Sequence, residues 1–152
     1  MREILFHGKR KDNGEWVEGF CQPVYKQPDK CFIGWYERAD QIIPTIRAVD
    51  PETVGQYTGK KDKKGKKIFE GHILRIQEKT LGHIEVGIVE YKDTKFVIDV
   101  YDKNWRYHKD IVESGELKDM QATIHLKYEY EVIGNIHDNP ELLTGGEAYG
   151  NS

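Results

Sequence analysis

KIFEGHILRIQEKTLGHIEVGIVEYKDTKFVIDVY, residues 67–101, decides the fold class of this 152-residue chain. Apolar side chains recur there at about every second position within three segments, and polar residues separate the segments. A period of two places alternate side chains on opposite faces of a strand, whereas a helix needs a period of about 3.6. Asp93-Thr94 is typical of a tight turn. The pattern predicts an antiparallel meander of three strands, 68–78, 83–92 and 95–102, with a bulge near Gly87.

The alternation weakens after the meander and then returns. Residues 104–123 have no clear period, so we expect a loop with one short helical piece there. Residues 124–137 alternate again and predict another strand. The segment NPELL is typical of a single helical turn, with Asn139 as its cap. The last residues, 144–152, are small and polar, which predicts a flexible tail.

The N-terminal part also has a period of two. Two apolar runs, near 2–8 and 15–21, flank the segment KRKDNG, and Asn13-Gly14 favours a hairpin turn with positive φ. Two prolines in QPVYKQPDK, residues 22–30, predict a loop or an edge segment. The remaining elements expected here are a strand at 31–37, a strand at 41–49 that is interrupted at Pro44, and a helical turn at 50–53 that Asp50 caps.

Together these elements predict a mainly β protein with few short helices. The segment IFEGHILRI, residues 68–76, is similar to the first strand of SH3-like barrels, in which a glycine lets the strand bend sharply. We therefore expect an N-terminal β subdomain over 1–58 that contains the hairpin. A small SH3-like curled sheet or barrel is expected over 59–143, and the flexible tail over 144–152.

Composition sets bounds on location and partners. Charged residues make up 32% of the chain and hydrophobic residues 38%, and 11% aromatic residues argue against disorder. No apolar stretch approaches the ~18 residues of a membrane helix, and the N-terminus has no apolar signal-peptide core. We expect a cytoplasmic protein with no membrane partner.

The net charge of −3 is uneven along the sequence. Residues 1–75 contain fifteen Lys and Arg against eleven Asp and Glu, a net +4. Residues 76–152 contain eight against fifteen, a net −7. This asymmetry favours head-to-tail self-association or a partner that recognises one end, to the extent that cellular salt leaves such fields unscreened.

Two cysteines, Cys21 and Cys31, lack the neighbouring Cys or His residues of a metal site. We expect them to be small buried residues in a reducing compartment. A disulfide between them requires strands that bring the two residues close.

A dense lysine run is the strongest candidate for ligand binding. Six ammonium groups close together attract a polyanion, and three aromatic residues of the second half offer a stacking surface for bases. The competing interpretation is a solvated turn that needs Gly65 for its backbone, with the aromatic residues in the core or in an oligomer contact. The candidate nucleic-acid residues are Lys60, Lys61, Lys63, Lys64, Lys66, Lys67, Trp105, Tyr107 and Tyr128.

The sequence carries no recognisable catalytic motif. A P-loop is absent because Ile68 follows Lys67, and there is no HExxH or GxSxG segment. We expect no catalytic residue, no metal and no cofactor, and therefore no enzymatic activity. A metal-dependent hydrolase would need a site built from residues that are distant in the sequence. At least three of the following would have to converge: His72, His83, His108, Glu85 and Asp99.

Two long segments resemble the signature of the YopX family of phage and prophage proteins. The segment VDPETVGQYTGKKDKKGKKIFEGHIL (49–74) is similar to the family pattern D.ETVGQYTG..DKNGK.I.EGDI, and EVIGNIHDNPELL (131–143) to EVIGNI.ENPELL. The opening MREILF with WVEG also resembles the family's N-terminal hairpin. The chain departs from the pattern at Lys64, at His72, which stands where the family often has Asp, and at His137-Asp138.

The resemblance implies a β-rich phage protein of unknown biochemical activity that forms oligomers, and it supplies no catalytic residue. We therefore expect a phage- or prophage-encoded accessory protein in the cytoplasm of a bacterial host. It would assemble into a homo-oligomer and bind another macromolecule, such as a host or phage protein. The alternative is a nucleic-acid-binding module that uses the loop from Lys60 to Lys67.

Overall fold

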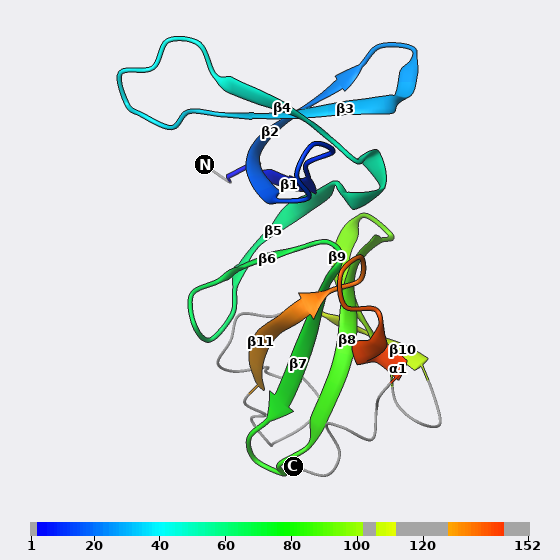
Figure 1. Cartoon of the computed structure of the whole chain (residues 1–152). Helices are drawn as coiled ribbons and strands as arrows, with labels where there is room; N and C mark the ends of the chain where they lie inside the picture. The colour runs from blue at the N-terminus through cyan, green and yellow to red at the C-terminus, as the bar shows by residue number, and fades with distance from the viewer. Residues whose placement is uncertain (1–2, 102–105, 112–127, 145–152) are drawn as a thin grey trace. The chain divides into compact units, whose positions relative to one another are not determined.

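The computed structural model describes residues 3–101, 106–111 and 128–144 (Figure 1). It divides into two compact units, residues 1–57 and 58–152. The chain is mainly β, as predicted, with two antiparallel sheets. Among the described residues, no helix has the length and hydrophobicity needed to cross a membrane.

The first unit consists of antiparallel strands and one 3-10 turn. Within this unit the strand order is β4-β3-β2-β1-β5, and β5 carries the chain into the second unit. The elements are β1 (Phe6–Lys9), β2 (Trp16–Val24), β3 (Gln27–Trp35), β4 (Thr45–Val49), η1 (Pro51–Thr53) and β5 (Gly55–Lys61).

Two predicted turns of this unit are confirmed. Gly14 has a φ of +73°, and the Asn13 side chain accepts a hydrogen bond from the Glu15 amide at 2.9 Å. The Asp50 side chain accepts a bond from the Glu52 amide at 3.1 Å and so caps η1, with Pro51 at the start of the turn. Short polar side chains that bind nearby amides make these turns local properties of the sequence.

Of the two alternatives predicted for residues 22–30, a loop or an edge segment, the structure confirms the edge segment. Strands β2 and β3 continue through Pro23 and Pro28 to a tight turn, in which Lys26 has a φ of +58°. This part of the hairpin is a two-stranded ribbon, because β1 pairs with β2 only as far as Gly19 and β4 pairs with β3 only from Cys31 onward. Each strand of the ribbon has only one neighbouring strand. A proline nitrogen that faces the open side therefore costs the sheet no hydrogen bond.

The core of the first unit covers one face of its sheet. Ile33 and Val49 are fully buried, and Cys31 is nearly so. Partly buried side chains pack around these three residues, among them Val17 and Trp35. On the opposite face, large apolar side chains remain exposed, as described below.

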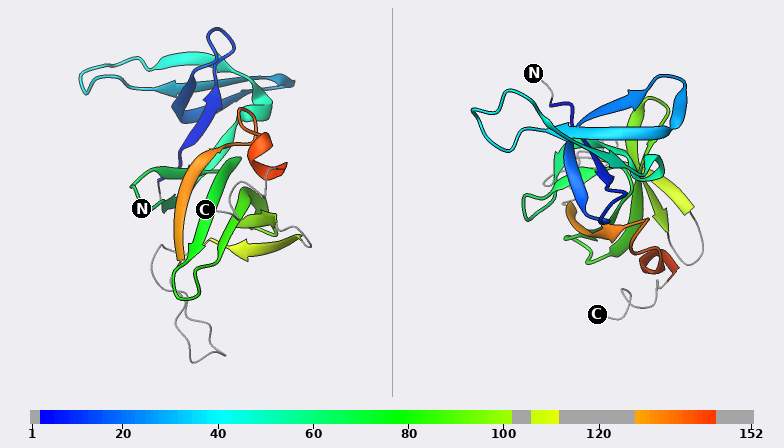
Figure 2. Two further views of the ribbon diagram at one scale, coloured as in Figure 1. Left: turned by 60° about the horizontal axis from the view of Figure 1, so that its bottom comes forward. Right: turned by 45° about the horizontal axis from the view of Figure 1, so that its top comes forward.

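The second unit contains a five-stranded sheet in the order β10-β9-β8-β7-β11 (Figure 2). The predicted meander is confirmed as β7-β8-β9, and its last turn has positive φ at Asp93 and Thr94. The elements are β6 (Lys67–Phe69), β7 (His72–Glu78), β8 (Ile84–Lys92), β9 (Lys95–Tyr101), β10 (Arg106–Asp110), β11 (Tyr128–Asn135) and α1 (Glu141–Thr144).

The second unit corrects two further predictions. No bulge occurs near Gly87, where the register of β8 is continuous with both neighbours. A side chain at Gly87 would come within 2.5 Å of Ile98 and 2.8 Å of the Asp99 carbonyl oxygen. Glycine is therefore needed there because the neighbouring strand β9 comes too close for a Cβ atom. The register shift lies in β11, between Val132 and Gly134.

The segment predicted as a loop with a helical piece, 104–123, contains strand β10. The rest of that segment, and residues 145–152 of the predicted tail, lie outside the described residues. Helix α1 confirms the single turn predicted at NPELL. Closure of the five strands into an SH3-like barrel stays a prediction.

Apolar clusters cover both faces of the second sheet. One cluster contains Leu74, Ile76, Ile98 and Tyr130. The other, on the opposite face, consists of three buried residues of β7 and β8, against which residues of α1 pack. A sheet that is buried on both faces explains the nearly continuous apolar runs of its central strands.

Candidate functional site

The lysine run forms the turn between β5 and β6, and the aspartate inside the run organises that turn. Asp62 is buried, and its Oδ1 accepts hydrogen bonds from the backbone amides of Lys64 at 2.9 Å and Lys66 at 2.8 Å. Its Oδ2 accepts a third bond, at 3.0 Å, from the amide of Val132 in β11. Gly65 has a φ of +81°, which confirms the glycine's expected role in the backbone of this turn. The carboxylate thus fixes the loop and ties it to a distant strand.

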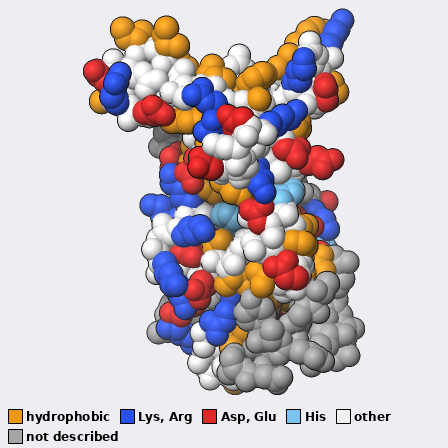
Figure 3. All heavy atoms as spheres, viewed as in Figure 1, with side chains coloured by type: hydrophobic (Ala, Val, Ile, Leu, Met, Phe, Trp, Pro, Cys, Tyr) orange, Lys and Arg blue, Asp and Glu red, His pale blue; other side chains and the backbone are white. Residues whose placement is uncertain are grey.

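Acidic partners offset part of the positive charge of this turn. Glu131 lies 2.8 Å from the Lys64 ammonium, 3.4 Å from that of Lys63 and 4.0 Å from the Arg75 guanidinium. The hydrogen bond from Lys64, followed by the other nearby lysine charge, holds the pKa of Glu131 below its ordinary value. Figure 3 shows the wider pattern, in which acidic and basic side chains alternate over the visible surface.

The other four lysines of the run stay on the same short segment. Lys61 and Lys66 are exposed, and Lys60 and Lys67 are half-buried. The structure therefore places the six predicted residues on the β5–β6 turn and the strand ends beside it, and two of them are paired with Glu131.

The aromatic candidates lie on a different part of the second unit. Tyr107 and Tyr128 pack against the core cluster that contains Tyr130, and the ammonium of Lys109 lies 5.6 and 4.7 Å from their ring centres. The Tyr107 hydroxyl and Lys109 both bind Glu85. Trp105 lies outside the described residues.

The charge asymmetry of the sequence does not separate the two units. Residues 1–57 contain eight Lys and Arg against nine Asp and Glu, a net −1. Residues 58–152 contain fifteen against seventeen, a net −2. The lysine run belongs to the same unit as the acidic strands that follow it, so the expected attraction between a basic and an acidic end has no basis in net charge.

Part of the residue set considered for metal chemistry converges. The His108 Nε2 lies 3.6 Å from an Asp99 oxygen, and Glu90, which the sequence analysis did not single out, lies beside them. His72 instead accepts a bond at its Nδ1 from the Phe69 amide at 3.0 Å, and His83 lies in the β7–β8 turn. Glu90 becomes a candidate only because β10 brings His108 close to Asp99. The sequence analysis predicted the segment of β10 as a loop and so could not find the cluster.

The first unit has an exposed apolar surface, which we call the open face. Of the ten large exposed hydrophobic residues among those described, seven lie in this unit. Phe20, Gly34 and Ile46 are register partners across β2, β3 and β4, and the Phe20 ring lies over Gly34. Ile42 and Ile43, in the β3–β4 loop, are 91% and 76% exposed. Figure 3 shows apolar side chains gathered over this loop and over the β2–β3 turn.

Comparison with known proteins gives a family and a fold. The model of a family described as YopX protein matches residues 5–144. No curated protein matches the chain. A solved structure, the crystal structure of protein EF1440 from Enterococcus faecalis, is 23% identical with a TM-score of 0.55, covering 94% of this chain and 99% of that one. The match to EF1440 supports the fold alone, whereas the family match spans almost the whole chain. This chain belongs to the YopX family.

Proposed function

We propose that this protein is a phage- or prophage-encoded accessory protein that acts by binding rather than by turnover, in the cytoplasm of a bacterial host. A second copy of the chain covers the open face, and the resulting homo-oligomer binds a host or phage protein. The observation that carries this proposal is the concentration of exposed apolar residues in the first unit. Several exposed apolar residues in one compact unit are typical of a surface that contacts another protein.

The position of β4 favours a second copy as the occupant. Within the described residues, β4 has β3 as its only strand partner, and its other side is met by an isolated bridge between Arg10 and Val49. The first residues of β4, Thr45–Arg47, therefore form an open edge. Two antiparallel edges related by a two-fold axis are self-complementary, because each strand offers the other the same pattern of donors and acceptors. Ile46 and Ile43 would be buried in such a contact.

Sedimentation velocity over a concentration series tests the proposal. We expect the wild-type chain to be an oligomer at micromolar concentration and the Ile46→Lys variant to be a monomer. The matched control is Leu81→Lys, which places the same charge at a 72% exposed apolar residue of the second unit and should leave the oligomer intact. A wild-type monomer at every concentration, or equal dissociation of both variants, would overturn the proposed self-association.

The alternative, a nucleic-acid-binding module, depends on the lysine turn keeping six ammonium groups together. It predicts retention on a phosphate-rich column that falls steeply with salt. It also predicts that Lys61→Ala with Lys66→Ala reduces the salt slope, whereas Lys26→Ala with Lys30→Ala, in the β2–β3 hairpin, does not. Absence of retention at low salt would dismiss this alternative.

A further inference from the structure

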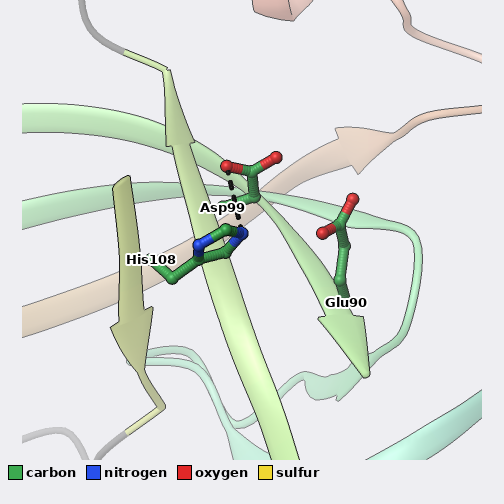
Figure 4. A group of neighbouring side chains, drawn as sticks. All are labelled: Glu90, Asp99 and His108. Carbon is green, nitrogen blue, oxygen red and sulfur yellow. Dashed lines mark ion pairs between the residues drawn. The ribbon is translucent and has the colours of Figure 1, made fainter. Parts of the chain in front are cut away.

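Three side chains with metal-binding atoms converge on one face of the second sheet, and they come from three neighbouring strands. Asp99 of β9 is the register partner of both Ile88 in β8 and His108 in β10. Glu90 is two residues from Ile88 and therefore lies on the same face. Figure 4 shows the three side chains pointing toward one another. Their ligand atoms all lie within 4.8 Å of each other.

The Asp99 carboxylate and one oxygen of Glu90 are shielded from solvent, which is unusual for an ion pair on a protein surface. The Asp99 side chain is 4% exposed, although it lies near an edge strand. Glu90 Oε2 is buried, and no described residue meets it with hydrogen-bond geometry, although the Lys92 ammonium lies 3.2 Å away. A buried carboxylate oxygen without a donor is costly unless a cation compensates it.

The ammonium of Lys92 is the cation nearest the cluster. It lies 3.2 Å from Glu90 Oε2 and 3.0 Å from His108 Nε2. An ammonium can only donate, so the His108 Nε2 accepts, and the lone pair that a metal would take is directed at this cation. The arrangement thus presents two carboxylates and one imidazole around a position that already attracts positive charge.

We propose that Glu90, Asp99 and His108 form a binding site for one divalent transition-metal ion of the zinc class, and that Lys92 competes with the metal for the site. Imidazole nitrogen favours zinc-class ions over magnesium or calcium, and carboxylates complete such sites. Tetrahedral zinc places its ligand atoms about 3.3–3.6 Å apart. The ligand atoms lie within 4.8 Å of one another, one pair of them 3.6 Å apart, and His108 is 47% exposed and so has room to move.

Three protein ligands leave at least one coordination position for water or for a group from a partner. The ion would also join β10, at the end of the described sheet, to β8 and β9. This site lies in the second unit and does not depend on the open face of the first, so it can be tested separately from the proposed self-association.

Isothermal titration of the full chain with zinc chloride, and with magnesium chloride for comparison, tests the site. We expect one zinc ion per chain and no saturable magnesium binding. His108→Ala should weaken zinc binding at least tenfold, and Glu90→Gln should weaken it in the same direction. Lys92→Met should strengthen it several-fold, because the competing ammonium is gone. His83→Ala, at an exposed histidine in the β7–β8 turn, is the matched control and should bind as the wild type does.

Circular dichroism establishes that each variant is folded, and Glu90→Gln keeps the test decisive if His108→Ala does not fold. A cobalt-substituted sample should show visible absorption bands that His108→Ala or Glu90→Gln removes. The proposal is overturned if neither the wild type nor Lys92→Met binds zinc. It is equally overturned if the folded His108 and Glu90 variants bind zinc as tightly as the control.

Discussion

Asp62 is the residue on which the lysine turn depends. Its carboxylate accepts three backbone amides, from Lys64, Lys66 and Val132, and it is buried while the lysines around it face solvent. A run of lysines has no reason of its own to adopt one conformation, because like charges repel. The aspartate supplies that reason by offering acceptors to the amides of the turn.

Replacing Asp62 by Ala should lower the free energy of unfolding by about 3 kcal/mol, because three backbone amides, one of them from Val132 in β11, lose a charged acceptor. Asp62→Asn, which keeps one acceptor oxygen, should lose less. Asp29→Ala, at an exposed position in β3, is the control and should have almost no effect. Urea denaturation measures all three, and equal stability of Asp62→Ala and the control would show that the turn does not need the carboxylate.

The two cysteines form a close pair of reduced thiols. Strands β2 and β3 bring their sulfur atoms to 3.2 Å, so the condition for a disulfide is met although both thiols are free. Burial, followed by the neighbouring Cys31, raises the pKa of Cys21 to about 12. A thiol with so high a pKa is a poor nucleophile near neutral pH.

We expect iodoacetamide to alkylate Cys21 far more slowly in the folded chain than in urea at about pH 8, because the thiolate is the reactive form. A thiol oxidant such as diamide should instead join Cys21 and Cys31 within one chain, with the oxidant taking up the two electrons and two protons. Mass spectrometry measures both reactions. Alkylation at the unfolded rate would contradict the raised pKa of the half-buried Cys21 thiol, and disulfides formed only between chains would contradict the geometry of the pair.

At the scale of elements, the two segments that carry the family signature hold each other in place. The Val132 amide donates to the Asp62 carboxylate at 3.0 Å, and the Ile136 amide donates to the Gly71 carbonyl at 2.9 Å. These bonds accompany the pairing of β11 with β7. The signature therefore describes turns and strand pairings of the second unit, which accounts for a recognisable family pattern without a catalytic motif.

The departure at His72 fits the same explanation. Its ring Nδ1 accepts the Phe69 amide within the turn between β6 and β7. A carboxylate in this position would also offer an acceptor to that amide. The histidine thus performs a structural task that an aspartate is suited to, and its presence does not by itself indicate a lost ligand.

The contact between the lysine turn and β11 should depend on pH. The pKa of Glu131 is lower in the folded chain than its ordinary value of 4.5, so the unfolded chain binds more protons between the two values. The stabilisation by Glu131 is fully present above the ordinary value and is lost as pH falls through the folded value. The melting temperature of the wild type should exceed that of Glu131→Gln at about pH 7, and the difference should disappear at about pH 3.

Glu37→Gln, at an exposed residue after β3, is the control for this titration and should follow the wild type at both pH values. A constant difference between wild type and Glu131→Gln across the range would mean that the carboxylate charge does not stabilise the turn. Thermal melts followed by circular dichroism are sufficient.

The sequence predicted elements well where each residue's neighbours decide its structure. Alternation found the meander of β7, β8 and β9, and capping chemistry found the turns at Gly14 and Asp50. Prediction from the sequence was incomplete where contacts between distant segments decide the structure. For residues 22–30 the prolines left a loop and an edge segment equally open, and only the pairing of β2 with β3 decides for the edge segment. The cluster at Glu90 depends on the register of three strands, one of which was predicted as a loop.

At the scale of the whole molecule, self-association should depend on apolar contact more than on charge. The two units have net charges of −1 and −2, which gives no basis for attraction between unlike ends. The open face contains Phe20 on β2 and Ile46 on β4, the two strands that flank β3, and Ile42 and Ile43 in the loop before β4. Burial of such side chains does not weaken with ionic strength, whereas attraction between exposed charges does.

The oligomer should therefore persist when sodium chloride is raised from low concentration to about 1 M, where the screening length falls to about 3 Å. Sedimentation equilibrium measures the dissociation constant across this range. A dissociation constant that rises steeply with salt would assign the contact to ion pairs and remove the open face from the account.

Hydrogen–deuterium exchange at low and high protein concentration tests the central claim most directly, because it locates the contact. We predict that amides in residues 42–48 exchange more slowly at high concentration, since the open edge of β4 then pairs with a second copy. Amides in β7 and β8 should exchange equally at both concentrations. Exchange in residues 42–48 that is independent of concentration, while another segment of the chain becomes protected, would contradict the assignment of self-association to the open face.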